Sequence, residues 1–289
     1  MGAATTVDDA ELESGLRRTW NVLAAACVSA ASLAAARPLA AQSAEPPEHK
    51  TFYSGKDAAI GAGFLAASAG LSIFDARLAH FFQDSMHLHV RVGRRVDNFF
   101  THINETTLTA GGLAVYAVAR LTGQHHVANA AFHVSESVFA ASVTSQLIRG
   151  PLGRTRPRDA DKPFENQYDF RFMQGFGHFQ QRAFPSIHSS SGFAAASAIV
   201  AEVHHRSPGA TWFVAVPAYA VAMTPGLSRM YLGQHWASDI FAGAVLGTFY
   251  GWRVVNYSYS HTTTPVDRVF LGKTDRTRTG IPVGWSVTF

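Results

Sequence analysis

Apolar residues gather into six long stretches along the chain, separated by polar segments that contain glycine or proline. The stretches cover residues 58–74, 107–119, 127–148, 189–203, 212–223 and 238–255. They are rich in residues that favour helix, and none shows the alternation of a half-buried strand. Small residues within them allow helices to approach one another closely. The pattern therefore predicts an all-α fold, a bundle of about six core helices.

The first 41 residues have the pattern of an export signal. Paired arginines, Arg17 and Arg18, precede an Ala-rich apolar stretch, and small residues flank a plausible cleavage point after Ala41. Such a segment is typical of a cleaved signal or, if it is retained, of an N-terminal anchoring helix. We expect export to the cell envelope of a bacterium.

The rest of the chain divides by composition into three parts. A linker rich in Pro and Glu covers 42–56, the helical domain covers 57–256, and a tail rich in Thr, Tyr and Arg covers 257–289. The last residues of the tail alternate between apolar and polar, which predicts a short strand-like or irregular segment packed on the bundle.

The composition favours contact with a membrane, but the lengths of the stretches do not require it. Only 15% of the residues are charged and 47% are hydrophobic, whereas about 25% are charged in ordinary soluble domains. Most stretches are shorter than the roughly 20 residues of a membrane span, or contain polar residues or proline. Only 58–74 and 238–255 suit a lipid environment. The alternative is a soluble bundle with Ala-rich core helices.

Charge and cysteine content narrow the class of partner. The formal net charge is +4, but the basic residues are scattered and form no lysine-rich run, so no nucleic-acid partner is expected. An anionic small molecule or a lipid head group fits better. The single cysteine, Cys27, excludes an intramolecular disulfide and a cysteine-based metal site.

Chemistry-bearing residues form three clusters, each beside the end of a predicted helix. The first cluster, "RGPLGRTRPRD", holds Arg149, Arg154, Arg156 and Arg158. A guanidinium group binds two phosphate oxygens at once and stays charged at any working pH. Taken alone, such a cluster is also typical of a solvated surface loop.

The second cluster, "FPSIHSSSGF", has the signature of a helix start. Unpaired backbone N–H groups there, together with the Ser186 hydroxyl, are suited to bind an anion. His188 lies within reach of the same anion and is a candidate proton donor. The alternative is a Ser-rich capping turn with an unrelated histidine.

The third cluster, "SRMYLGQHWASD", combines Arg229, His235 and Asp239. His235 and Asp239 are four residues apart, so on a helix they share a face, where the carboxylate holds one ring nitrogen and leaves the other free as a nucleophile. Arg229 is placed to bind the same phosphate. A histidine and an aspartate at this spacing also occur as a surface pair or a helix cap.

Together the three clusters resemble the signature of the type 2 phosphatidic acid phosphatase and vanadium haloperoxidase superfamily. That signature has a basic residue, six others and Arg-Pro, then Pro-Ser-Gly-His, then Ser-Arg, five others, His, three others and Asp. This chain matches its order and spacing with Arg149, Arg156-Pro157, Pro185-Ser186-Ile187-His188, Ser228-Arg229, His235 and Asp239.

Two positions depart from the family pattern. Arg149 stands where lysine is usual, which keeps the charge and changes the hydrogen-bond geometry. Ile187 stands where glycine is usual, and a β-branched residue does not readily adopt a positive φ. Its N–H remains a donor if the backbone there enters an ordinary helix.

The resemblance implies a phosphotransfer reaction that needs no metal or other cofactor. Vanadate, as a phosphate mimic, is expected to bind in the same pocket. His235 attacks phosphorus to form a phosphohistidine, Asp239 orients His235, and His188 protonates the departing oxygen. Arg149, Arg156, Arg229, Ser186 and the Ile187 N–H hold the phosphate oxygens.

These residues predict a phosphatase acting on a phosphate monoester or diphosphate, with a lipid such as a phosphatidate or polyprenyl diphosphate as the substrate. The protein is expected at the membrane or in the periplasm, with its site facing the periplasm. Three alternatives stay open: a secreted soluble acid phosphatase, a vanadium-dependent haloperoxidase that uses vanadate as its cofactor, and a non-catalytic envelope binding protein.

Overall fold

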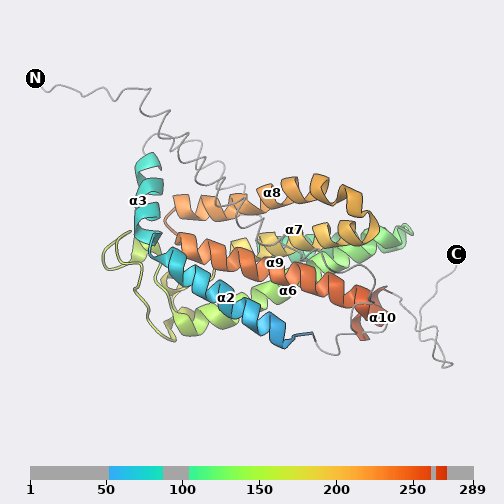
Figure 1. Cartoon of the computed structure of the whole chain (residues 1–289), viewed down its shortest axis with the longest axis horizontal. Coiled ribbons are helices and arrows are strands. Elements are labelled where there is room, and N and C mark those ends of the chain that lie inside the picture. The colour runs from blue at the N-terminus through green and yellow to red at the C-terminus, as the bar shows by residue number, and fades with distance from the viewer. Residues whose placement is uncertain (1–51, 87–103, 262–264, 272–289) are drawn as a thin grey trace, which may run out of the picture. The chain divides into compact units, whose positions relative to one another are not determined.

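The computed structural model describes residues 52–86, 104–261 and 265–271, and these residues form an all-α bundle (Figure 1). The predicted fold class is therefore confirmed. The described residues all belong to one compact unit, Glu48–Phe289. The predicted export signal lies outside the described residues, as do most of the linker and the closing strand-like segment.

Six of the described helices correspond to the six predicted stretches. Five extend past the predicted limits at both ends, whereas the first begins three residues earlier than predicted and ends two residues earlier. They are α2 (Gly55–Ser72), α5 (Glu105–Leu121), α6 (His125–Leu152), α7 (Ile187–Arg206), α8 (Thr211–Tyr231) and α9 (Ala237–Ser260). Two further helices are α3 (Asp75–Met86) and α10 (Pro265–Leu271). The start of the predicted tail is therefore helical, because α9 continues to Ser260.

Local capping interactions set the ends of several helices. Ser54 begins α2 with a capping box formed with Asp57, and Asn104 begins α5 by accepting the N–H groups of two residues in its first turn. Gly153 ends α6 in the left-handed region, with φ of 60°. A Cβ atom at Gly153 would also lie 1.9 Å from the Arg171 carbonyl oxygen, so both the conformation and the packing require glycine there.

The closest helix contact in the core is between α7 and α9, which run parallel. Gly243, Gly247 and Gly251 recur every fourth residue of α9 and face α7, where an added Cβ would overlap existing atoms at 2.2–2.4 Å. Because the absent side chains let the two backbones touch, the helices pack at short range. The nearest residues of the α7 segment to these glycines, in the same order, are Ser186, Ser190 and Ser197.

Two other neighbours of α7, the helices α6 and α8, run in the opposite direction to it. Ser145 of α6 contacts Ser190 near the start of α7, at 2.9 Å between their hydroxyl oxygens. Arg229 in the last turn of α8 contacts His188 in the first turn of α7. One end of the bundle therefore holds the N-terminal ends of α7 and α9 and the C-terminal ends of α6 and α8, which is where the three sequence clusters lie.

The opposite end of α6, α7 and α9 carries a buried polar network. His133 is hydrogen-bonded through Nδ1 to Glu202 and through Nε2 to the Ser258 hydroxyl, the latter at 3.0 Å. Arg206 and Tyr259 also reach the Glu202 carboxylate, at 2.8 Å and 3.1 Å. Polar groups in a core must be paired in this way, so the network joins three helices at this end.

One described helical segment, Pro208–Tyr231, is long and apolar enough to cross a membrane, and only 22% of its apolar window is buried. It comprises α8 and the short turn before it. Segments Gly55–Ser72 and Asp75–Phe82 pass the same test only as a pair bent by 59°. The sequence favoured 58–74 and 238–255 for lipid instead. The predicted stretch 212–223 was too short because the helix continues past it, through Pro225, to Tyr231.

Candidate active site

A cavity of about 400 Å³ opens at the end of the bundle where the three sequence clusters meet. Its lining comes from the start of α5, the ends of α6 and α8, the start of α7 and the loops between them. The lining residues are Asn104, Glu105, Thr106, Gln146, Arg149, Arg156, Phe179, Arg182, Ile187, His188, Arg229, Gln234 and His235. Six of the eight predicted site residues are among them. Ser186 and Asp239 are not, and both lie directly behind the cavity wall.

His235 presents one ring nitrogen to the cavity. Its Nδ1 lies 2.7 Å from the carbonyl oxygen of Ala183, and because a carbonyl only accepts, Nδ1 carries the proton and Nε2 keeps its lone pair. Burial lowers the pKa of His235 to about 4, although Asp239 opposes the shift. Neutral His235 is therefore a nucleophile with its lone pair available above about pH 4.

Asp239 does not hold His235 in the way that the sequence suggested. The sequence placed both residues on one face of the last helix, but α9 begins at Ala237, so His235 precedes the helix. The carboxylate oxygen lies 3.6 Å from His235 Nδ1, which is outside hydrogen-bond range. Asp239 instead accepts the Trp236 N–H at 2.7 Å, so it acts on His235 through charge and through the start of α9.

Arg154 fixes the Asp239 carboxylate from behind. Its guanidinium donates to Asp239 at 2.6 Å, to Ser238 at 2.8 Å and to Asp75 of α3 at 2.8 Å. All four side chains are almost completely buried. Burial lowers the pKa of Arg154, but the two carboxylates outweigh it and hold that pKa above its usual value. For Asp239, Arg154 and His235 outweigh burial and keep the pKa low.

His188 faces the cavity beside an arginine. Its Nε2 lies 3.1 Å from Nη2 of Arg229, and since a guanidinium only donates, Nε2 accepts and Nδ1 carries the proton. That Nδ1 is buried without a hydrogen-bond partner in the described part of the chain. Burial and the charge of Arg229 lower the pKa of His188 to about 3. A negative charge in the cavity would offset the charge of Arg229 and so raise the pKa of His188.

The buried arginines make the cavity strongly positive. Burial and the neighbouring Arg182 lower the pKa of Arg149 to about 10. Burial, Arg149 and Arg158 lower the pKa of Arg156 to about 9. Cations that repel one another in a poorly solvated space favour an anion between them. The parallel helices α7 and α9 add the positive ends of their dipoles on the same side.

The first turn of α7 shows why isoleucine is tolerated in place of glycine. Ile187 is the first residue of an ordinary α-helix, and its φ is not among the positive values of the described residues. Its N–H and that of His188 have no acceptor within the helix. Ser186 is the N-cap: its hydroxyl oxygen accepts the Ser189 N–H at 3.4 Å, so it shapes this turn rather than lining the cavity.

Sequence reasoning missed several residues that build the site. Gln234 precedes His235 and accepts from Arg229 at 2.9 Å. Phe179 lies under Arg156, with its ring centroid 3.7 Å from the guanidinium carbon, and Arg182 accompanies Arg149. Arg154 was noted in the first cluster but not assigned to the site. Asp75 lacks any local signal, because its partners are 79 and 163 residues away.

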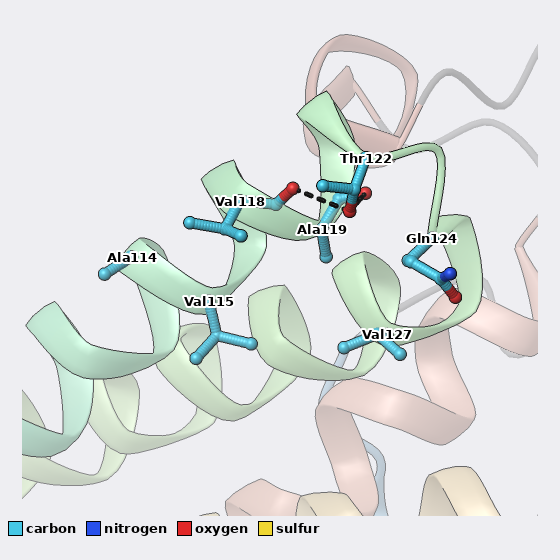
Figure 2. Close-up of a pocket in the computed structure, with 7 residues that line it drawn as sticks. All are labelled: Ala114, Val115, Val118, Ala119, Thr122, Gln124 and Val127. Carbon is cyan, nitrogen blue, oxygen red and sulfur yellow. Dashed lines mark hydrogen bonds between the residues drawn. The ribbon is translucent and has the colours of Figure 1, made fainter.

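A second pocket, between α5 and α6, has a different character (Figure 2). It is wide and almost entirely apolar, and Val115, Val118 and Val127 face it. It holds no charged side chain, so it offers no chemistry of the kind found in the cavity. Among the described residues, no three His, Cys, Asp or Glu side chains gather in a way that would hold a metal ion.

Residues 130–262 match the family model of the PAP2 superfamily. The resemblance predicted from the three motifs is thereby confirmed. The PAP2 segment contains all eight predicted site residues and Arg154, whereas Asp75 and Glu105 lie before it. It runs from the first turns of α6 to just past the end of α9.

Two bacterial proteins are similar to parts of the chain. Over 129 residues, 44% of this chain, it is 29% identical to the lipid A 4'-phosphatase of Bacteroides thetaiotaomicron, of which the match covers 51%. Over 69 residues, 24% of this chain, it is 39% identical to the lipid A 1-phosphatase of Porphyromonas gingivalis, of which the match covers 15%. The chain thus spans about half of one relative and less of the other.

One solved structure is also similar to part of this chain. It is the transmembrane PAP2-type phosphatidylglycerolphosphate phosphatase from Bacillus subtilis, at 18% sequence identity. The likeness covers 66% of this chain and 96% of that chain, with a TM-score of 0.32.

We predict that Arg154→Gln destabilises the protein by about 3–5 kcal/mol, because it leaves the Asp75 and Asp239 carboxylates buried without their shared cation. Adding Asp75→Asn should recover part of this loss, since one of the two buried charges is then removed. Chemical denaturation of the single and double variants measures both effects.

Arg158→Gln is the matched control, because the Arg158 side chain is 44% exposed in the same loop. Its effect should stay within about 0.5 kcal/mol. Equal stabilities for the Arg154 and Arg158 variants would contradict the role given to the buried guanidinium.

We also predict that sulfate binds more tightly as the pH falls from about 7 to about 5. A bound anion raises the lowered pKa of His188, so binding takes up a proton when the pH lies between the two pKa values. Sulfate keeps both of its charges over this range. The dissociation constant should fall by up to about tenfold per pH unit for one proton.

The His188→Gln variant removes the group that takes up the proton. Its sulfate affinity, measured by titration calorimetry, should therefore change less with pH than that of the wild type. The same slope in both proteins would show that His188 does not sense the anion.

Proposed function

We propose that this chain is a phosphatase that hydrolyses a phosphate ester of a lipid through a phosphohistidine on His235. The supporting observation is that two neutral imidazoles and three guanidinium groups, supplied by separate motifs, line a single cavity. An accessible imidazole lone pair is a nucleophile, and arginines that surround it stabilise the charge on a transferring phosphoryl group. The similarity to two lipid A phosphatases and the PAP2 match support the same reaction class.

The first half of the reaction forms a bond from His235 Nε2 to phosphorus as the bond to the leaving oxygen breaks. The proton on His235 Nδ1 stays there and is donated to the Ala183 carbonyl oxygen, and the nearby Asp239 carboxylate stabilises the positive ring. Arg229 turns from His188 to the phosphoryl oxygens, which frees His188 to hold a proton. His188 gives that proton to the leaving alkoxide, so the product is a neutral alcohol.

The second half returns the enzyme to its starting state. Neutral His188 takes a proton from a water molecule, whose oxygen attacks phosphorus, and the bond to His235 breaks. Arg149, Arg156 and Arg229 hold the equatorial oxygens through both steps, with the N–H groups that begin α7. Inorganic phosphate then leaves. Vanadate, a tetrahedral oxyanion of similar shape, is proposed to bind the same groups as an inhibitor.

Exposed aromatic side chains beside the cavity support a lipid as the substrate. Phe179 lines the cavity, and both Phe176 and Phe179 are 56% exposed. Arg182 holds their loop in place by donating to the carbonyl oxygens of Gly175 and Phe176, both at 2.6 Å. Apolar side chains held at a polar cavity in this way fit an amphiphile whose phosphate enters while its chain stays outside.

The exposed face of α8 supports attachment to a membrane. Trp212, Phe213 and Val216 are 64–83% exposed on the segment that is long enough to span. We infer that this face contacts lipid and that the protein belongs to the cell envelope. A site that opens to the periplasm remains our proposal from the family and the leader sequence.

The nucleophile can be tested with p-nitrophenyl phosphate, whose leaving group needs no proton. In His188→Gln, the first step should proceed while the second is slow, giving a burst of about one equivalent of p-nitrophenolate. The trapped phosphate should be acid-labile and should map to His235 by mass spectrometry. His235→Gln should show no burst and about a 1,000-fold or greater loss of turnover. Phosphate on another residue would refute the assignment.

The lipid preference can be tested with Phe176→Ser. The measured quantity is the ratio of kcat/KM on a short-chain phosphatidate, used below its critical micelle concentration, to kcat/KM on p-nitrophenyl phosphate. This ratio should fall about tenfold, because an apolar contact to the acyl chain is lost. Phe213→Ser is the control, since that ring is 83% exposed and lies sixteen residues from Arg229 along α8, about 24 Å. An unchanged ratio in Phe176→Ser would argue for a soluble substrate.

A further inference from the structure

Glu105 is an ionisable side chain in the cavity that the proposed reaction does not use. It lies in the first turn of α5 and lines the cavity with Gln146, which is one turn before Arg149 on α6. Its Oε2 atom is buried and has no hydrogen-bond partner in the described part of the chain. Buried carboxylate oxygens without donors are rare, so this one needs a physical explanation.

The position of Glu105 is unexpected because the other charged groups in the cavity suit an anion. A carboxylate next to a bound phosphate would repel it. Among the described residues, no Lys, Arg or His nitrogen lies within ion-pair distance of Glu105, although its charge is felt at Arg149. The cavity lining therefore contains a carboxylate, the amide of Gln146 and Thr106 as well as the arginines.

A phosphate ester carries both parts that such a cavity fits. The phosphoryl group satisfies the arginines, and the group attached to it reaches the carboxylate and the amide of the lining. An ionised carboxylate only accepts hydrogen bonds, and the amide of Gln146 both accepts and donates. The part of the ligand that contacts Glu105 must therefore carry donors, such as hydroxyl or amide N–H groups, close to the phosphate. An esterified diacylglycerol has none there, whereas a sugar or polyol has several.

We propose that Glu105 and Gln146 form a leaving-group subsite that selects phosphate esters of sugars or polyols, with Glu105 accepting a hydrogen bond from a hydroxyl or amide next to the phosphorylated carbon. This inference rests on the proposed function, but it concerns ligand binding. Binding affinity can be measured without turnover. It narrows the substrate class to a lipid whose phosphate is carried on a sugar or polyol.

The test uses the His235→Gln protein, which binds ligands without converting them. Titration calorimetry gives the affinity for N-acetylglucosamine 1-phosphate and the affinity for inorganic phosphate. The quantity compared is the first affinity divided by the second. Adding Glu105→Ala should lower this ratio about 10- to 100-fold, the range of one charge-assisted hydrogen bond. Glu105→Gln should restore part of it, because the amide oxygen still accepts.

Glu165→Ala is the matched control, since Glu165 is an exposed glutamate outside the cavity lining. It should leave the ratio unchanged. If Glu105→Ala weakens both ligands equally, Glu105 serves as a distant charge partner of Arg149 and the inference is wrong. If it strengthens both equally, the carboxylate only repels anions and the inference is also wrong. Failure of the proposed function would show separately, as wild-type protein that turns over no ester.

Discussion

The buried guanidinium of Arg154 is the interaction on which the geometry of the site depends. It joins Asp75 of α3, Ser238 and Asp239 of α9, and the loop after α6. A single lysine would not reach these partners at once, because an ammonium group has no planar fork. Two carboxylates share one cation here, so neither is free to turn toward the arginines of the cavity. Asp239 is thereby kept ionised behind His235 while the cavity itself stays positive.

The close parallel contact of α7 with α9 explains where that positive cavity lies. Glycines on α9 bring the two backbones together, and because the two helices run parallel, both begin at the same end of the bundle. The antiparallel helices α6 and α8 end there, and each places an arginine in its last turn. Arginine at a helix C-terminus is favourable, and an anion at a helix N-terminus is favourable too. The dipoles of the four helices thus stabilise both the arginines and a bound anion at this end of the bundle.

The sequence predicted what depends on local periodicity and on motif spacing. Six helices and the eight residues proposed for the site followed from it, and the structure places six of the eight around one cavity. It did not predict contacts set by tertiary packing. The carbonyl of Ala183 takes the place expected for Asp239 because the chain before α7 passes His235. Asp75 and Glu105 come from distant helices, and nothing near them in sequence marks them.

Comparison with the opposite end of the bundle shows what separates this site from a structural network. There the hydroxyl of Ser258 contacts His133, and His133 contacts Glu202. A hydroxyl nucleophile, its base and the base's carboxylate are connected in the same order. Each of these three residues is at most 4% exposed, and no cavity described in the structure is lined by them. Both nitrogens of His133 are paired, whereas His235 uses one nitrogen for Ala183 and turns the other to a cavity. A catalytic imidazole needs an unpaired nitrogen facing space that a substrate can enter, and in the described bundle His235 meets both conditions while His133 meets neither.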